Sequence, residues 1–63
     1  MELWISRNPN GVLKLFNVEP VYDEFFETWE TFVEDGFVGY LDKEEMTEVT
    51  FENSPKRVGL KML

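Results

Sequence analysis

The chain has 63 residues, a net charge of −7, no cysteine and no histidine. A chain of this length forms one small domain that buries only about 60% of the surface its unfolded form exposes. The composition excludes disulfides, disfavours the usual zinc sites, and lacks both the commonest general base and the thiol nucleophile of enzymes. The ten aromatic residues are therefore the main material available for a core.

Two N-terminal segments, residues 2–7 and 12–17, favour β-strands. Residues 8–11 between them read Asn-Pro-Asn-Gly, which matches a three-residue hairpin loop with a glycine bulge. We therefore predict a hairpin in which Ile5 lies opposite Leu15.

The predicted register divides this hairpin into two faces. The aliphatic face is expected in the core and carries Leu3, Ile5, Leu13 and Leu15. The other face carries Trp4, Ser6, Lys14 and Phe16. Trp4 and Phe16 must then be covered by another element or stay exposed, which makes them candidates for partner binding.

Residues 21–35 are compatible with two structures. Their large apolar side chains fall at helical spacing, which favours an amphipathic helix. Poor helix formers, like-charge pairs four residues apart and the Asp35-Gly36 turn signal favour a hairpin instead. We expect a hairpin that turns at 35–36, with Val33 opposite Val38 and room for a helical turn at 21–27. The alternative is an α+β fold in which an amphipathic helix at 21–34 packs on the sheet.

The C-terminal third contains weaker signals. Residues 42–46 are typical of a polar connector, and residues 49–51 favour a short strand. Alternating apolar residues then predict a final strand at 57–62. The whole chain is therefore expected to be a mainly β, single-domain antiparallel sheet spanning residues 1–63.

Two segments, one near each end of the chain, have distinctive sequences. Residues 3–7 read Leu-Trp-Ile-Ser-Arg, and residues 48–55 read Glu-Val-Thr-Phe-Glu-Asn-Ser-Pro. In these segments the chain resembles a group of very short uncharacterised bacterial and phage-encoded proteins, which begin with a similar "LWIAR" strand and end in "EVTFENSP" or "EVTWEDSP". The resemblance implies a β-rich fold and residence in a phage or mobile element, where small acidic proteins include inhibitors of host defence. Residues 23–34 depart most from the group, and no functional residue is carried over.

The strongest functional signal is charge. Twelve acidic residues and one basic residue, Lys43, lie between Glu19 and Glu52, which gives this segment a charge of −11. On a helix, one stripe would be formed by Asp23, Glu27, Glu30 and Glu34. On a hairpin, the acids near one end of the sheet would instead be Glu30, Glu34, Asp35 and Asp42. The candidate partner-binding residues are Asp23, Glu27, Glu30, Glu34, Asp35, Asp42, Trp4 and Phe16.

These observations favour a small acidic, non-enzymatic interaction protein that binds a basic, nucleic-acid-binding surface of a host protein. The alternative is a structural or accessory protein that self-associates, as a homodimer for example, and uses its acids only for solubility. No cofactor, metal or catalytic residue is predicted. Repulsion by phosphates and anionic lipids argues against direct binding to nucleic acid or membranes. Without a signal peptide or apolar span, the chain is expected in the cytoplasm.

Overall fold

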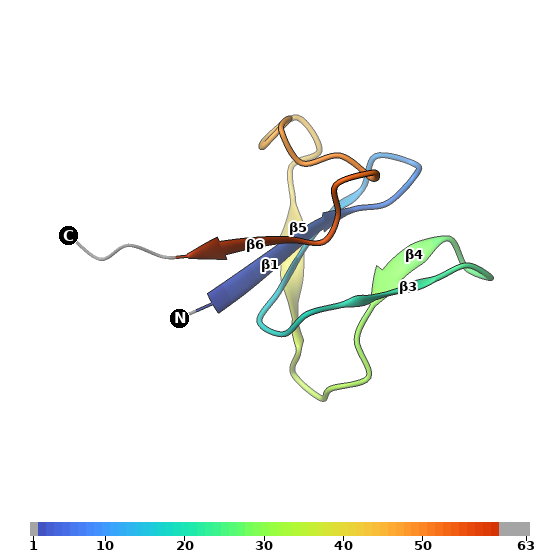
Figure 1. The fold of residues 1–63 in the computed structure, drawn as a ribbon, viewed down its shortest axis with the longest axis vertical. Helices are drawn as coiled ribbons and strands as arrows, with labels where there is room; N and C mark the ends of the chain where they lie inside the picture. The colour runs from blue at the N-terminus through green and yellow to red at the C-terminus, as the bar shows by residue number, and fades with distance from the viewer. Residues whose placement is uncertain (1, 60–63) are drawn as a thin grey trace.

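The computed structural model describes residues 2–59, and these form six strands and no helix. The strands are β1 (Glu2–Arg7), β2 (Leu13–Phe16), β3 (Val21–Asp23), β4 (Thr28–Glu30), β5 (Phe37–Leu41) and β6 (Lys56–Gly59) (Figure 1). The predicted mainly β fold is confirmed. Within the described range, no helix is long and apolar enough to cross a membrane.

The strands form two antiparallel sheets (Figure 1). One has four strands in the order β5-β2-β1-β6, and the other pairs β3 with β4. The N-terminal hairpin β1–β2 lies at the centre of the larger sheet. Its predicted register is confirmed, with Ile5 opposite Leu15 and Trp4 opposite Phe16.

The turn between β1 and β2 has the predicted chemistry. The amide of Asn8 donates to the Val12 carbonyl at 2.8 Å, and the amide of Gly11 donates to the Asn8 carbonyl at 2.9 Å. Gly11 has a φ of 96°, a conformation that glycine adopts without the steric cost of a β-carbon. The turn of the hairpin therefore has the geometry that its local sequence predicts.

The core lies under the aliphatic face of this hairpin, as predicted. Ile5 and Leu13 are buried together with Val49, which comes from the long loop after β5. Four half-buried residues pack around them: Leu15, Leu41, Met46 and Val58. The 42–55 loop therefore forms the second layer of the domain, in place of the short strand predicted at 49–51.

Arg7 holds this loop against the hairpin. Its Nε donates to the Val49 carbonyl at 2.6 Å, and its terminal nitrogens donate to four more backbone carbonyls. Those carbonyls belong to Gly11, Lys43, Glu45 and Met46. The fork of guanidinium donors can satisfy several carbonyls that a loop would otherwise leave unpaired.

The "EVTFENSP" segment closes the loop through its own hydrogen bonds. Thr50 and Asn53 exchange two bonds, from the Thr50 amide to Asn53 Oδ1 at 2.8 Å and from the Asn53 amide to Thr50 Oγ1 at 3.2 Å. Ser54 Oγ donates to the Thr50 carbonyl and accepts from the Arg7 amide at 2.9 Å. The two ends that carry the resemblance are therefore joined directly in the fold.

The opposite face of the hairpin is covered by β4. The amide of Trp29 donates to Asn8 Oδ1 at 2.9 Å, and the Trp29 indole donates to the Arg7 carbonyl at 3.1 Å. Asn8 Nδ2 also donates to Thr28 Oγ1 at 2.8 Å. The buried Asn8 side chain thus pairs with β4 much as a backbone amide would, and it docks the small sheet onto the large one.

Three expectations for the middle of the chain are wrong, one of which was the alternative fold. The helix at 21–34 is absent, and the helical turn at 21–27 is replaced by β3 and a tight turn. The hairpin turning at 35–36 is also absent, because β4 pairs with β3 and β5 pairs with β2. The predicted strand at 57–62 is confirmed as β6 through Gly59, and its remaining residues lie outside the described range.

Packing explains why Asp35-Gly36 does not close a hairpin. Asp35 has a φ of 63°, but a β-carbon on Gly36 would lie 2.9 Å from methyl groups of Thr31 and Val18. The Gly36 amide donates to the Val33 carbonyl, which closes a turn that redirects the chain toward β2. Gly36 is therefore needed for close packing. The Asp35-Gly36 turn connects β4 to β5, but these two strands do not pair with each other.

Candidate functional site

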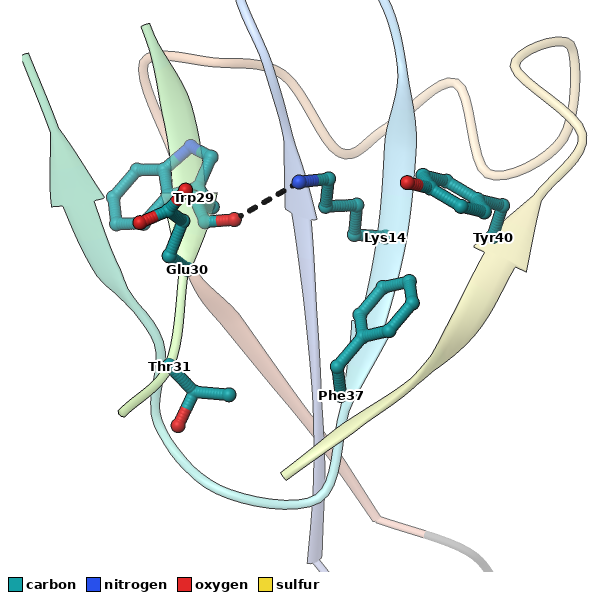
Figure 2. Close-up of a pocket in the computed structure, with 6 residues that line it drawn as sticks. All are labelled: Lys14, Trp29, Glu30, Thr31, Phe37 and Tyr40. Atoms are coloured by element: carbon teal, nitrogen blue, oxygen red, sulfur yellow. Dashed lines mark hydrogen bonds between the residues drawn. The ribbon is translucent and has the colours of Figure 1, made fainter. Parts of the chain in front are cut away.

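A groove opens between β4 and β5 on the face of the large sheet that the small sheet covers (Figure 2). It encloses about 360 Å³. Its lining combines two charged side chains with three aromatic rings and a threonine: Lys14, Trp29, Glu30, Thr31, Phe37 and Tyr40. An aromatic groove with a few polar groups is a typical shape for a binding site.

Lys14 extends from β2 across the floor of this groove toward β4 (Figure 2). Its ammonium donates to Thr28 Oγ1 at 2.6 Å and to the Trp29 carbonyl at 3.2 Å. It also lies 5.9 Å from the ring centroids of both Phe37 and Tyr40, within the range of cation–π attraction. Lys14 therefore joins the two sheets and places a positive charge on the floor of the groove.

A β-bulge builds the aromatic wall of the groove. Phe37 and Tyr40 are three residues apart, so a regular strand would place them on opposite faces. The β2–β5 register shifts next to Phe16, which adds one residue on the β5 side. Both rings consequently lie on one face, with centroids 5.1 Å apart, and Phe37 also packs edge-on against Phe16.

The turn between β3 and β4 presents a second aromatic feature. Asp23 Oδ1 accepts from the amides of Phe25 and Phe26 at 2.9 and 3.2 Å, which fixes the turn. The two phenylalanines contact each other but are 86% and 68% exposed. Glu24 and Glu27 flank them. The turn therefore displays an apolar pair inside an acidic rim.

The charge of this turn affects the pKa of the Tyr22 phenol. Its ring packs against Trp29 and Phe51, with centroids 5.2 and 5.1 Å away. The pKa of its phenol is raised above the ordinary value of 10.0, first by desolvation and then by the nearby carboxylates of Glu27, Glu24 and Asp23. The three carboxylates thus act together on one site.

The structure separates the predicted acidic residues. Asp23 and Glu27 lie at the β3–β4 turn, while Glu30 is on β4 and lines the groove. With no helix there, the predicted stripe of Asp23, Glu27, Glu30 and Glu34 does not exist.

The predicted cluster at one end of the sheet does not form either. Glu34 and Asp35 precede β5, whereas Asp42 follows it. At about 3.3 Å per residue, a five-residue strand separates the two groups by roughly 15 Å or more. Figure 1 shows the three acidic loops, after β3, before β5 and after β5, on different sides of the domain.

The two aromatic candidates have different positions. Trp4 is half-buried on β1, and Phe16 is 1% exposed. Phe16 therefore belongs to the interior and is no longer a candidate for partner binding. Lys14, Phe37 and Tyr40 were missed as groove residues. The face of Lys14 was predicted correctly, but the pairing of β5 with β2 and the bulge that brings Phe37 and Tyr40 onto that face were not.

The acidic residues between Glu19 and Glu52 form no ion pair with a basic side chain of the described residues. Across residues 2–59, the one ion pair joins Arg57 to Glu2 at 3.2 Å, and Glu2 lies outside that segment. No three acidic side chains of the described residues converge into a group that could hold a metal ion. Most acids of the segment lie in three loops, after β3, before β5 and after β5.

Fold and surface together define a small antiparallel β domain with an acidic, aromatic-rich exterior. Comparisons of the chain with protein families, with curated proteins and with solved structures find no match.

Proposed function

We propose that this chain is a small, non-enzymatic interaction protein that binds a basic surface of another protein. The observation that carries the proposal is the absence of ion pairs within the acidic segment of the described chain, together with the exposed rings beside its acids. Phe25, Phe26 and Phe32 are 86%, 68% and 88% exposed. Exposed aromatics supply contact area, and the surrounding charge accelerates encounter with a basic partner.

A surface used by nucleic acid is the kind of basic surface that fits best. A field of separated carboxylates attracts such a surface much as phosphates do. The resemblance to phage-encoded proteins favours a host protein as the owner of that surface, and inhibition follows if the bound chain excludes nucleic acid.

Retention from a host lysate tests this function. The chain would be coupled to resin, and capture would be compared at low and high salt. A variant with Glu24, Glu27, Glu30 and Glu34 changed to glutamine should lose the captured protein, whereas a Glu2→Gln control should retain it. Asp23 is left unchanged because it fixes the β3–β4 turn. Equal capture by all three proteins would contradict the proposal.

A second candidate function is self-association as a structural protein. It is favoured by β5, an edge strand that contains no charged residue. Sizing chromatography at two concentrations tests it, since an associating chain elutes earlier at the higher concentration. Elution as a monomer at both concentrations would exclude this candidate.

A further inference from the structure

β5 ends the four-stranded sheet, and no strand of the described chain pairs with its outer side. On its inner side, the Asn17 amide donates to the Gly36 carbonyl, so odd-numbered residues of β2 direct their backbone groups toward β5. Gly39 and Leu41 are the register partners of such residues and therefore face β2.

Alternation from Gly39 and Leu41 turns the backbone groups of Tyr40 outward, and Val38, the extra residue of the bulge, has no register partner on β2. The side chains of Val38 and Tyr40 are 53% and 68% exposed, and Tyr40 also lines the groove. A β-carbon on Gly39, between them, would meet no atom within 4 Å. The edge is therefore open at its backbone and on both of its faces.

β5 also lacks the charges that protect sheet edges. It is the one described strand with no acidic or basic residue, whereas the opposite edge strand, β6, begins with Lys56 and Arg57. Edge strands usually carry such residues to prevent pairing with other chains. Their absence from β5 marks this edge as a place for strand addition.

Charge at the two ends of β5 selects the incoming strand. Glu34 and Asp35 precede it, and Asp42, Glu44 and Glu45 follow it. Lys43 and the Arg7 guanidinium, which bonds the Lys43 and Glu45 carbonyls, are positive charges at the second end, and acids still outnumber them. A second copy in antiparallel register would bring one acidic end against the other. A basic segment would instead be attracted at both ends.

We propose that β5 receives an extended segment of the partner as an added strand, and that this segment alternates apolar and basic residues. Its apolar side chains lie on the Tyr40 face, beside Phe37 and the groove, because Lys14 on the groove floor disfavours a cation there. Its basic side chains lie on the other face and reach the acids that flank β5. Backbone bonds to Val38 and Tyr40 supply the pairing. This mode of binding rests on the proposed function and specifies its partner.

Two synthetic peptides of equal charge and length test the proposal. One alternates arginine and valine, and the other alternates arginine and proline, which lacks the N–H groups a strand needs. The arginine–valine peptide should bind roughly tenfold more tightly, since only it can add to the edge. In hydrogen exchange by NMR, it should protect the amides of Val38 and Tyr40 and leave that of Tyr22, on the small sheet, unchanged.

Two variants sharpen this comparison. Val38→Pro removes the N–H of the residue that has no partner on β2 and should reduce the affinity for the arginine–valine peptide to that for the proline peptide. Val38→Thr keeps the N–H and should bind as the parent does. If Val38→Pro fails to fold, the exchange measurement on the unmodified chain decides.

The outcomes separate this proposal from the proposed function. Equal affinity for both peptides without protection of Val38 and Tyr40 would overturn strand addition. If the glutamine variant then lost both peptides, binding by charge alone would stand. Protection of the same amides at high protein concentration without peptide would show that a second copy occupies the edge, which would also overturn the proposal.

Discussion

At the scale of single residues, the fold depends on polar side chains that replace missing backbone partners. Arg7 and Asn8 are adjacent at the end of β1, yet they secure different parts of the molecule. Arg7 binds the carbonyls of the loop under one face, and Asn8 binds β4 over the other. A short chain without disulfides thus uses two neighbouring side chains to join its layers.

Replacing Arg7 should therefore be costly. Arg7→Met keeps much of the aliphatic length but removes every donor to the loop carbonyls, and hydrogen bonds to charged groups each contribute about 1.5–3 kcal/mol. We expect a loss of about 2 kcal/mol or more in the free energy of unfolding, measured by urea denaturation. Arg57→Met is the matched control, because its ion pair with Glu2 is exposed and should contribute about 1 kcal/mol or less. Equal losses in the two variants would contradict the role given to Arg7.

Gly36 and Gly39 provide a second matched pair. Gly36→Ala should destabilise the fold by about 1–3 kcal/mol, because the new methyl group would press on Thr31 and Val18. Gly39→Ala meets open space and should change stability by about 0.5 kcal/mol or less. Thermal unfolding of both variants checks this. A Gly36→Ala variant as stable as its parent would show that the turn before β5 is loosely packed.

At the scale of elements, local signals predicted the parts of the fold that local chemistry controls. The first hairpin follows from its Asn-Pro-Asn-Gly turn and the alternation around it, and its register was predicted residue by residue. The partners of β4 and β5 could not be predicted this way. Asp35-Gly36 resembles a hairpin turn, but pairing of β5 with β2 places Leu41 opposite Leu13 over the core. That long-range gain outweighs the local turn preference.

The same limit applies to the aromatic residues. Length and composition assigned most of them to the core, yet Phe25, Phe26 and Phe32 are largely exposed. Two aromatics, Phe16 and Trp29, are buried, and the other buried apolar residues of the described chain are Ile5, Leu13 and Val49. The helical spacing of apolar residues in 21–35 therefore does not reflect a helix. The exposed rings could be identified as candidates for binding only from the structure.

The β3–β4 turn makes a prediction about pH. Because the pKa of Tyr22 is raised in the folded state, folding disfavours its phenolate. The stability linked to Tyr22 is therefore present below the unfolded pKa of about 10 and lost as the pH rises through the higher folded pKa. Changing Glu24 and Glu27 to glutamine removes two of the causes and should move the Tyr22 pKa back toward 10. Desolvation should still keep it raised.

Alkaline titration of tyrosinate absorbance checks this in a Tyr40→Phe background, where Tyr22 is the remaining tyrosine. A Tyr22 pKa that is the same with and without the two carboxylates would show that the turn does not concentrate their charge near the phenol.

At the scale of the whole molecule, different segments of the chain form the large sheet and the acidic surface. The two ends supply β1, β2 and β6 of the large sheet, and the acidic middle supplies its edge strand β5, the small sheet and most of the loop that Arg7 holds. Most of the charge that would destabilise a compact core is carried on the loops after β3, before β5 and after β5. Residues 23–34, which depart most from the resembling proteins, carry the exposed phenylalanines Phe25, Phe26 and Phe32, and β5, the proposed edge for strand addition, follows them.

The salt dependence of binding tests this account most directly. Affinity for the arginine–valine peptide should fall steadily as salt concentration rises, because carboxylates that attract the peptide are screened. The variant with Glu24, Glu27, Glu30 and Glu34 changed to glutamine should bind more weakly and show a shallower dependence on salt. Binding that is insensitive to salt and identical in the two proteins would contradict the claim that the acidic segment is a binding surface.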